Sequence, residues 1–476
     1  MRPFFIYNTL SRKVEEFVPL KPGVVTYYSC GPTVYLPQHL GNMRTFLFTD
    51  TLTRTLRLNG YDVRHVMNIT DVGHMTSDED AGEDKIEKTA RAEGRSPTEV
   101  ADYYTGLFIR DLEMLQIEKP TVPPGQFCRA TEYIPDMIAL IGRILEQGYA
   151  YVVDSGVYFD VEKWRGPNRM GRLSRQSLEE QHSEQRLEHA SDKRSKHDFA
   201  LWVLNQPAHA MQWDSPWGRG YPGWHIECSA MSMKYLGETI DIHSGGLDHV
   251  PIHHENEIAQ SESATGRPFV RYFVHSAFLV GMEGAKISKS SGRFPVLADL
   301  VAAGIDPIAF RLFCFGAKYR SELTFSLDAV RAAQSNLDYL TEFARGVQLE
   351  CAHGADGDWA HPYFERFQEA LNNDLNTPQA LAVVLEVVRE SYRRNDKRIW
   401  NTLVRMDSVL GLDLEGIRRR AASETLPAEI EALRAQRDEA RKRKDFARSD
   451  ALRRELLSRG FDVKDTSSGT VVQRRN

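Results

Sequence analysis

Four side chains in this sequence have the chemistry to hold a soft divalent cation: Cys30, Cys228, His253 and Glu257. His253 and Glu257 lie four residues apart in a predicted helix and therefore share a face, as two ligands of one ion must. Two thiolates, an imidazole and a carboxylate suit zinc in softness and in number. Two alternatives stay open, because His254 is a rival ligand and each cysteine alone fits a small buried apolar residue at least as well.

Two further stretches suit phosphate chemistry. His39-Leu40-Gly41-Asn42 stands at the predicted start of a helix, where free backbone amides favour an anion, the imidazole can donate to phosphate oxygens and the glycine leaves their path clear. Lys286-Ile287-Ser288-Lys289-Ser290 places two lysines on a Gly- and Ser-rich loop, where they would neutralise a polyphosphate as charge moves onto it. Taken alone, the second stretch is more typical of a solvated loop. Together the two stretches favour a nucleoside triphosphate substrate.

A βαβ unit at residues 24–69 must position most of these groups. Val24–Tyr28 is β-branched and aromatic and predicts a buried strand, and Val63–Ile69 predicts a second strand after an intervening helix. In such a unit a ligand lies at the carboxyl end of the strand, which is where Cys30 stands. Thr70 and Asp71 end the second strand at the same sheet edge, so they become candidate substrate contacts.

The rest of the chain alternates between apolar periodic segments and charged ones. Residues 74–92 are rich in charge and poor in periodicity, which predicts a solvated loop or an exposed helix. Residues 165–196 are also highly charged, and this middle portion interrupts the α/β pattern like an insertion. The apolar patterns predict helices at 98–115, 134–145 and 253–264, a hairpin at 149–153 and 157–161, and a largely helical chain beyond residue 290.

Composition excludes several classes of protein. The chain has 476 residues, 41% of them hydrophobic and 26% charged, which is typical of a soluble protein of two to four domains. A formal net charge of -6 argues against a uniformly nucleic-acid-coating surface, so such a partner must be met by local patches such as Arg441–Lys444. Five cysteines do not make a disulfide framework. No signal peptide or membrane-length apolar run is present, so we expect a cytoplasmic protein without a membrane partner.

The motifs taken together resemble those of the cysteinyl-tRNA synthetases, which are class I aminoacyl-tRNA synthetases. Their two signatures match His39–Asn42 and Lys286–Ser290. The resemblance runs almost end to end, through Cys30–Tyr35, Asn68–Asp71, Gly223–Met231, His253–Gln260, Tyr319–Ser321 and Asp374–Pro378. The family's first signature usually ends in histidine, where this chain has Asn42, and the family commonly has a tryptophan where Val471 follows Gly469-Thr470.

The resemblance implies the following roles. Zinc, one ion per chain, would be held by Cys30, Cys228, His253 and Glu257, and the amino acid would lie among Cys30, Gly31, Thr70, Trp224 and His243. ATP, with Mg²⁺, would be bound by His39, Gly41, Asn42, Lys286, Ser288 and Lys289, of which His39, Asn42, Lys286 and Lys289 would be catalytic. The partners would be cysteine, ATP and tRNA(Cys), and we expect a monomer.

The function that this resemblance predicts is cysteine–tRNA ligation. A tRNA-independent cysteine ligase is a rival, but such an enzyme needs no anticodon grip and so no long C-terminal region. A catalytically silent zinc-dependent RNA-binding module is a second rival, which the intact Lys286 and Lys289 disfavour. A dinucleotide oxidoreductase fits poorly, because no glycine-rich fingerprint follows the first strand.

The predicted fold class is α/β: a Rossmann-like parallel-sheet catalytic domain with an insertion, then a helical-bundle domain and a small C-terminal domain. We expect the first half of the catalytic domain at 1–125, a connective insertion at 126–209 and the second half, with the zinc and amino-acid site, at 210–280. The signature loop and junction would occupy 281–345, the helical tRNA-binding domain 346–425 and the small anticodon-binding domain 426–476.

Overall fold

The computed structural model describes residues 2–72, 84–165, 170–176, 192–207, 209–281, 294–348, 351–352, 354–423, 426–466 and 469–474. The predicted ATP-binding residues Lys286, Ser288 and Lys289 lie outside these ranges. The chain forms two compact units, residues 1–343 with 347–414, and residues 344–346 with 415–476.

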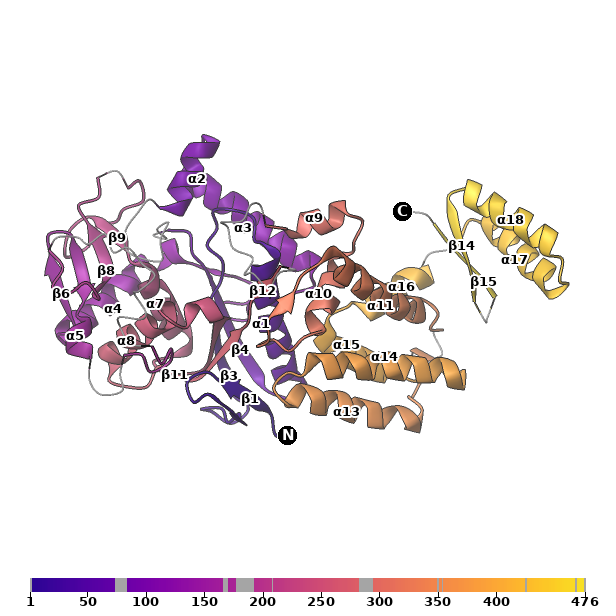
Figure 1. Cartoon of the computed structure of the whole chain (residues 1–476), viewed down its shortest axis with the longest axis horizontal. Helices are drawn as coiled ribbons and strands as arrows, with labels where there is room; N and C mark the ends of the chain where they lie inside the picture. Colours follow the sequence, from indigo (N-terminus) through magenta and orange to yellow (C-terminus); the bar gives the residue numbers. More distant parts are fainter. Residues whose placement is uncertain are drawn as a thin grey trace. The chain divides into compact units, whose positions relative to one another are not determined.

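A parallel sheet of five strands is the centre of the larger unit (Figure 1). Its order is β11-β10-β3-β4-β5, with bounds Val270–Ser276, Ile240–Gly246, Val24–Ser29, Asp62–Ile69 and Cys128–Arg129. From β3 the chain proceeds outward to β4 and β5 on one side, while β10 and β11 extend the sheet on the other. This order makes a switch point between β3 and β10, where open α/β sheets bind their ligands. The predicted Rossmann-like fold is confirmed.

Helix α1 (Leu40–Leu58) packs along the sheet because its apolar side chains recur at helical spacing. Phe48, Leu52 and Leu56 are buried in one cluster with Tyr27 of β3 and Val63 of β4. The predicted βαβ unit is therefore present. Its helix begins directly after His39, so the first turn of α1 lies at the carboxyl edge of the sheet.

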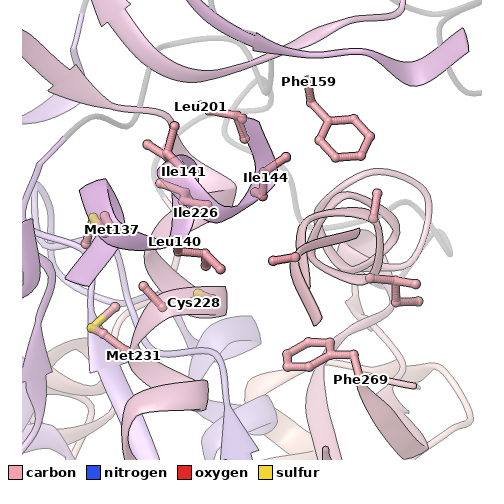
Figure 2. Packing of buried hydrophobic residues seen from close by; sticks show 14 of the residues in the cluster. Met137, Leu140, Ile141, Ile144, Phe159, Leu201, Ile226, Cys228, Met231 and Phe269 are labelled. Carbon is pink, nitrogen blue, oxygen red and sulfur yellow. The ribbon is translucent and has the colours of Figure 1, made fainter. Parts of the chain in front are cut away.

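A second, antiparallel sheet follows β5 in the chain. Its four strands are β6 (Ala150–Val153), β7 (Gly156–Phe159), β8 (Phe199–Leu204) and β9 (Gly220–Pro222). Helices α4 (Ile134–Glu146) and α7 (Trp224–Leu236) share its apolar core, in which Leu140, Ile144, Leu201, Ile226 and Cys228 are buried together (Figure 2). The core thus fixes α7, and with it Cys228, against the inserted sheet.

The remaining elements of the larger unit are mostly helical after residue 294, as predicted. They are β1 (Phe5–Asn8), β2 (Lys13–Glu16), α2 (Lys85–Glu93), α3 (Pro97–Met114), α5 (Val161–Trp164), α8 (His253–Thr265), β12 (Leu279–Val280), α9 (Leu297–Ala302), α10 (Pro307–Phe315), β13 (Leu323–Thr324), α11 (Leu327–Arg345), α13 (His361–Asn372), α14 (Thr377–Arg394) and α15 (Trp400–Leu410). Short 3₁₀ turns lie at Ala130–Tyr133, Leu247–His249 and Asp358–Ala360. In the described residues no helix is both long and apolar enough to cross a membrane.

Asp374 joins three distant parts of the larger unit. Its carboxylate accepts hydrogen bonds from the backbone N–H of Tyr7 at 2.9 Å, from Tyr319 Oη at 2.8 Å and from Arg320 Nε at 2.5 Å. Its own N–H donates to the carbonyl of Phe5 at 3.0 Å. The motifs at Tyr319–Ser321 and Asp374–Pro378 therefore meet at one buried carboxylate, which ties the first strand to the start of α14.

The smaller unit consists of α16 (Leu414–Ser423), α17 (Ala428–Lys442), α18 (Phe446–Ser458) and the antiparallel pair β14 (Phe461–Thr466) and β15 (Gly469–Arg474). The two long helices bury Ile430, Leu433, Leu452 and Leu456 against the strands. The basic run Arg441–Lys444 lies at the end of α17 and in the turn after it and is exposed, and Phe446, of which 67% is exposed, begins α18.

Candidate active site

A cavity of about 930 Å³ opens at the carboxyl ends of β3 and β4, beside the first turn of α1. Most predicted site residues line it: Cys30, Gly31, His39, Gly41, Asn42, Thr70, Trp224, Cys228 and His253. Lys85 and Asp248 add charged groups to the wall, and Phe278 and Phe294 add apolar surface. One cavity therefore contains both the predicted phosphate-binding turn and three of the four soft donors.

The phosphate-binding turn is held by His39, which caps α1. His39 Nδ1 accepts the backbone N–H of Asn42 at 3.1 Å, so in the neutral ring the proton is on Nε2. The N–H of Leu40 donates to the carbonyl of Pro295 at 2.9 Å. A Cβ on Gly41 would lie 3.0 Å from the His39 ring, so glycine leaves the imidazole its place. The helix start thus presents a fixed imidazole to the cavity.

Gly31 lets the ends of β3 and β4 come together. A Cβ at this position would lie 1.7 Å from the carbonyl oxygen of Asn68, which only glycine avoids. The N–H of Gly31 donates to Asn68 Oδ1 at 2.8 Å, and Asn68 Nδ2 donates to Thr70 Oγ1 at 3.1 Å. This chain of contacts places Thr70 on the wall of the cavity that Cys30 also lines.

The soft donors converge on the neighbouring wall. Ligand atoms of Cys30, Cys228, His253 and Glu257 all lie within 4.8 Å of one another, and all four side chains are buried. A second set, Cys30, His243, His254 and Glu257, meets the same distance criterion. Cys30 follows β3, Cys228 lies on α7, and His253 and Glu257 lie one turn apart on α8. The two sets share one thiolate and one carboxylate, so they compete for one cation.

Accessibility favours the first set. Cys30, Cys228 and His253 line the cavity, whereas His243 and His254 are not among the described residues that do. His254 Nδ1 is bonded to His275 Nε2 at 2.8 Å and its Nε2 lies 3.4 Å from Cys30 Sγ. An ion held by the first set could be reached by a substrate.

Neighbouring histidines orient this first set. His225 Nδ1 lies 2.8 Å from His253 Nδ1, which leaves His253 Nε2 to face Glu257 Oε1 at 3.0 Å. His243 Nε2 bonds Glu257 Oε2 at 2.8 Å. The buried Glu257 Oε1 meets His253 Nε2 at 3.0 Å as an ion pair. Two metal-binding groups that face each other at this distance fit a metal ion held between them.

The electrostatics of the four donors point the same way. Burial disfavours charge on His253, but Glu257 and Cys228 outweigh it and raise the pKa of His253 to about 10. Burial likewise opposes ionisation of Glu257, yet His243 and His253 lower its pKa to about 2. A hydrogen bond from Cys30 lowers the pKa of Cys228 to about 6. The cluster therefore holds a proton on His253 where its anionic groups attract positive charge, and a divalent cation would displace that proton.

The other predicted contacts differ in their surroundings. Trp224 lines the cavity with its ring 4.4 Å from that of His253. His243, predicted to contact the amino acid, bonds Glu257 Oε2 through Nε2 and is not among the described residues that line the cavity. The Asp71 carboxylate is occupied by Arg129 Nε at 2.9 Å and by Thr131, so it braces the sheet.

Sequence reasoning missed two members of the histidine network. His225 follows Trp224 and stands three residues before Cys228, so its helical spacing was a usable signal. His275 lies near the end of β11, the same kind of position that singled out Cys30.

Family comparisons cover most of the chain. A family model described as tRNA synthetases class I (C) catalytic domain matches residues 16–335. A DALR domain model matches residues 366–415, and a Cysteinyl-tRNA ligase anticodon binding domain model matches residues 423–472.

Individual relatives agree with the family models. The chain is 42% identical to a cysteine–tRNA ligase of Treponema denticola, covering 98% of each chain, and 42% identical to one of Chlorobaculum tepidum, covering 100% of each. Among solved structures, methionyl-tRNA synthetase of Mycobacterium tuberculosis bound to methionyl-adenylate superposes with a TM-score of 0.54 at 15% identity, covering 84% of this chain and 90% of that one. That likeness concerns the fold.

Proposed function

The chain belongs to the cysteine–tRNA ligases, which are class I aminoacyl-tRNA synthetases, and from this premise we propose how its cavity works. The cavity would bind cysteine and ATP side by side, form cysteinyl-adenylate and pass the cysteinyl group to tRNA(Cys). The observation that carries this proposal is the soft donor set Cys30, Cys228, His253 and Glu257, of which the first three lie in the wall of a cavity that also contains a helix start.

Zinc fits that donor set. Two thiols, one of them with a lowered pKa, an oriented imidazole and a buried carboxylate match its preferred ligands. When bound, zinc would supply a soft Lewis acid for the substrate's sulfur. A serine hydroxyl is harder and less acidic, so serine would leave the site without its ligand, which is the situation that gives large discrimination without editing.

The remaining walls would orient the amino acid and ATP. Gly31, Thr70 and Trp224 stand around the donor set and would surround the substrate's backbone. His39, Gly41 and Asn42 would meet the phosphates at the start of α1.

Activation requires no covalent bond to the protein. A carboxylate oxygen of cysteine attacks the α-phosphorus of Mg²⁺-bound ATP and the bond to the β-phosphate oxygen breaks. Lys286, Ser288 and Lys289 of the second signature would stabilise the charge that moves onto the departing pyrophosphate. In the second step a hydroxyl of the terminal ribose of tRNA attacks the carbonyl carbon of the adenylate, and AMP leaves.

The smaller unit would hold the anticodon stem-loop. Arg441–Lys444 are exposed at the end of α17 and would contact phosphates, which set affinity without reading sequence. Phe446, 67% exposed at the start of α18, offers the flat aromatic face on which an unpaired base stacks. It would serve where the family's commoner tryptophan after Gly469-Thr470 is absent.

Cysteine-dependent exchange of pyrophosphate into ATP, followed by charging of total tRNA, tests the proposal. We expect both reactions, with zinc at about one ion per chain. Pyrophosphate exchange without tRNA charging would contradict the transfer of cysteine to tRNA and would favour a tRNA-independent cysteine ligase. Active protein that contains no zinc would contradict the role of the donor set. We further propose that the enzyme works in the cytoplasm as a monomer.

A further inference from the structure

We propose that Gln38 is a positioning residue for adenylate formation: it fixes the side-chain amide of Asn42 so that a hydrogen-bond donor faces the phosphates of ATP. This inference rests on the proposed function, because it takes ATP as the ligand at the start of α1. Gln38 and Asn42 both line the cavity.

The orientation of Gln38 is set by its neighbours. Gln38 lies in the turn before α1 and is only 7% exposed. Its Nε2 donates to the carbonyl oxygen of Thr33 at 3.2 Å and to that of Leu36 at 3.3 Å, which uses both amide hydrogens. Its Oε1 therefore faces Asn42 and accepts from Asn42 Nδ2 at 3.1 Å. Reversing the amide of Gln38 would place its oxygen against two carbonyl oxygens, so the network permits one orientation.

This contact decides how Asn42 is presented. Asn42 Oδ1 is buried and has no hydrogen-bond partner in the described part of the chain, although the residue as a whole is only partly buried. The polar atom of the side chain left for the cavity is accordingly Nδ2, which has a second hydrogen beyond the one given to Gln38. Phosphate oxygens accept hydrogen bonds and do not donate them. The hydrogen that Asn42 Nδ2 keeps is thus the kind of donor that a triphosphate needs.

This orientation of Asn42 leaves its side-chain oxygen without a hydrogen-bond partner among the described residues. A buried acceptor without a partner is destabilising, and rotation of the Asn42 amide by half a turn would bring Oδ1 towards the cavity and its solvent. Gln38 opposes that rotation because its own oxygen would then face Asn42 Oδ1. An amide has a donor side and an acceptor side, so asparagine at this position needs a neighbour that selects the donor.

A double-mutant cycle tests the inference. Gln38→Met, Asn42→Ala and the double variant are compared in cysteine-dependent pyrophosphate exchange, with KM for ATP and for cysteine measured separately. The exposed Gln147 at the end of α4 gives a matched control, Gln147→Met. We expect Gln38→Met to lower kcat/KM for ATP roughly tenfold, the scale of one hydrogen bond to a charged group, with KM for cysteine unchanged. In the Asn42→Ala background the same change should have almost no further effect.

Two outcomes would overturn the inference: wild-type kinetics in Gln38→Met, or an equal loss in both backgrounds, which would mean that Gln38 acts only by holding its own turn. Should Gln38→Met fail to fold, Gln38→Ala repeats the cycle. The proposed function fails in a different way, since unmodified enzyme without cysteine-dependent exchange would refute it before any variant is compared.

Discussion

Replacing Gly31 by alanine should disable the amino-acid end of the cavity. The added Cβ would lie 1.7 Å from the carbonyl oxygen of Asn68, whereas real Cβ contacts essentially never fall under 3.0 Å, so the two groups must separate by at least 3.0 − 1.7 = 1.3 Å. The obstacle is backbone, and Ser29 is paired with Met67 immediately before it, so the strand ends themselves must move apart. A displacement of about 1 Å at reacting groups can slow a reaction roughly hundredfold.

The assay is cysteine-dependent pyrophosphate exchange, with kcat and KM for cysteine measured beside zinc content. Gly106→Ala is the matched control, because Gly106 lies in α3 with no atom within 4 Å of an added Cβ. That control should leave exchange unchanged and raise the free energy of unfolding by about 0.5 to 1 kcal/mol, as alanine does within a helix. Wild-type kcat and KM for cysteine in Gly31→Ala would refute the argument that the strand ends position the substrate.

Three further predictions address the metal, the RNA and the core. Cys228→Ser should lower the zinc content and raise KM for cysteine roughly tenfold or more, while KM for ATP stays unchanged. Elemental analysis measures the first effect, and pyrophosphate-exchange kinetics measure the other two. Phe446→Ala should reduce tRNA charging roughly tenfold to hundredfold without affecting pyrophosphate exchange, and unchanged charging would exclude stacking. Burial lowers the pKa of His65 to about 3, below its ordinary 6.5, so the folded state resists the proton. The contribution of the neutral His65 ring to the free energy of unfolding is complete above pH 6.5. It falls by about 1.4 kcal/mol per pH unit as the pH drops towards 3, because the unfolded chain binds a proton there and the folded chain does not. His65→Gln, which keeps a partner for Ser29, should flatten urea-unfolding free energy over that range.

The spacing of apolar residues in the sequence predicted the helices and strands whose buried side chains are apolar. Phe48, Leu52 and Leu56 predicted α1, and the helix predicted at Thr98–Leu115 is α3, one residue displaced because Ser96 caps it and exchanges hydrogen bonds with Glu99. The sequence pattern does not decide whether the region of α2 is a loop or an exposed helix. One reason is that the helix buries a polar side chain: Glu87 accepts the N–H of Ala210 at 2.7 Å, a partner 123 residues away.

The sequence likewise predicted some features of the site and not others. The meeting of His253 and Glu257 follows from helical spacing, and the position of Cys30 follows from the end of a parallel strand. The place of His243 behind Glu257 and the use of Asp71 by Arg129 depend on which way each side chain turns in the folded molecule. Those orientations are decided by partners far apart in sequence, which periodicity does not reveal.

The position of Asp374 has a consequence for synthesis of the protein. Tyr7 leaves the ribosome early, but the carboxylate that binds its N–H is encoded 367 residues later. At about 5 to 20 residues per second, the nascent first strand therefore waits about 20 to 70 seconds for that partner. Phe5, Val14, Val18 and Leu20 remain exposed around this hairpin even after folding. During translation the amino-terminal segment thus lacks this partner until residue 374 has been made.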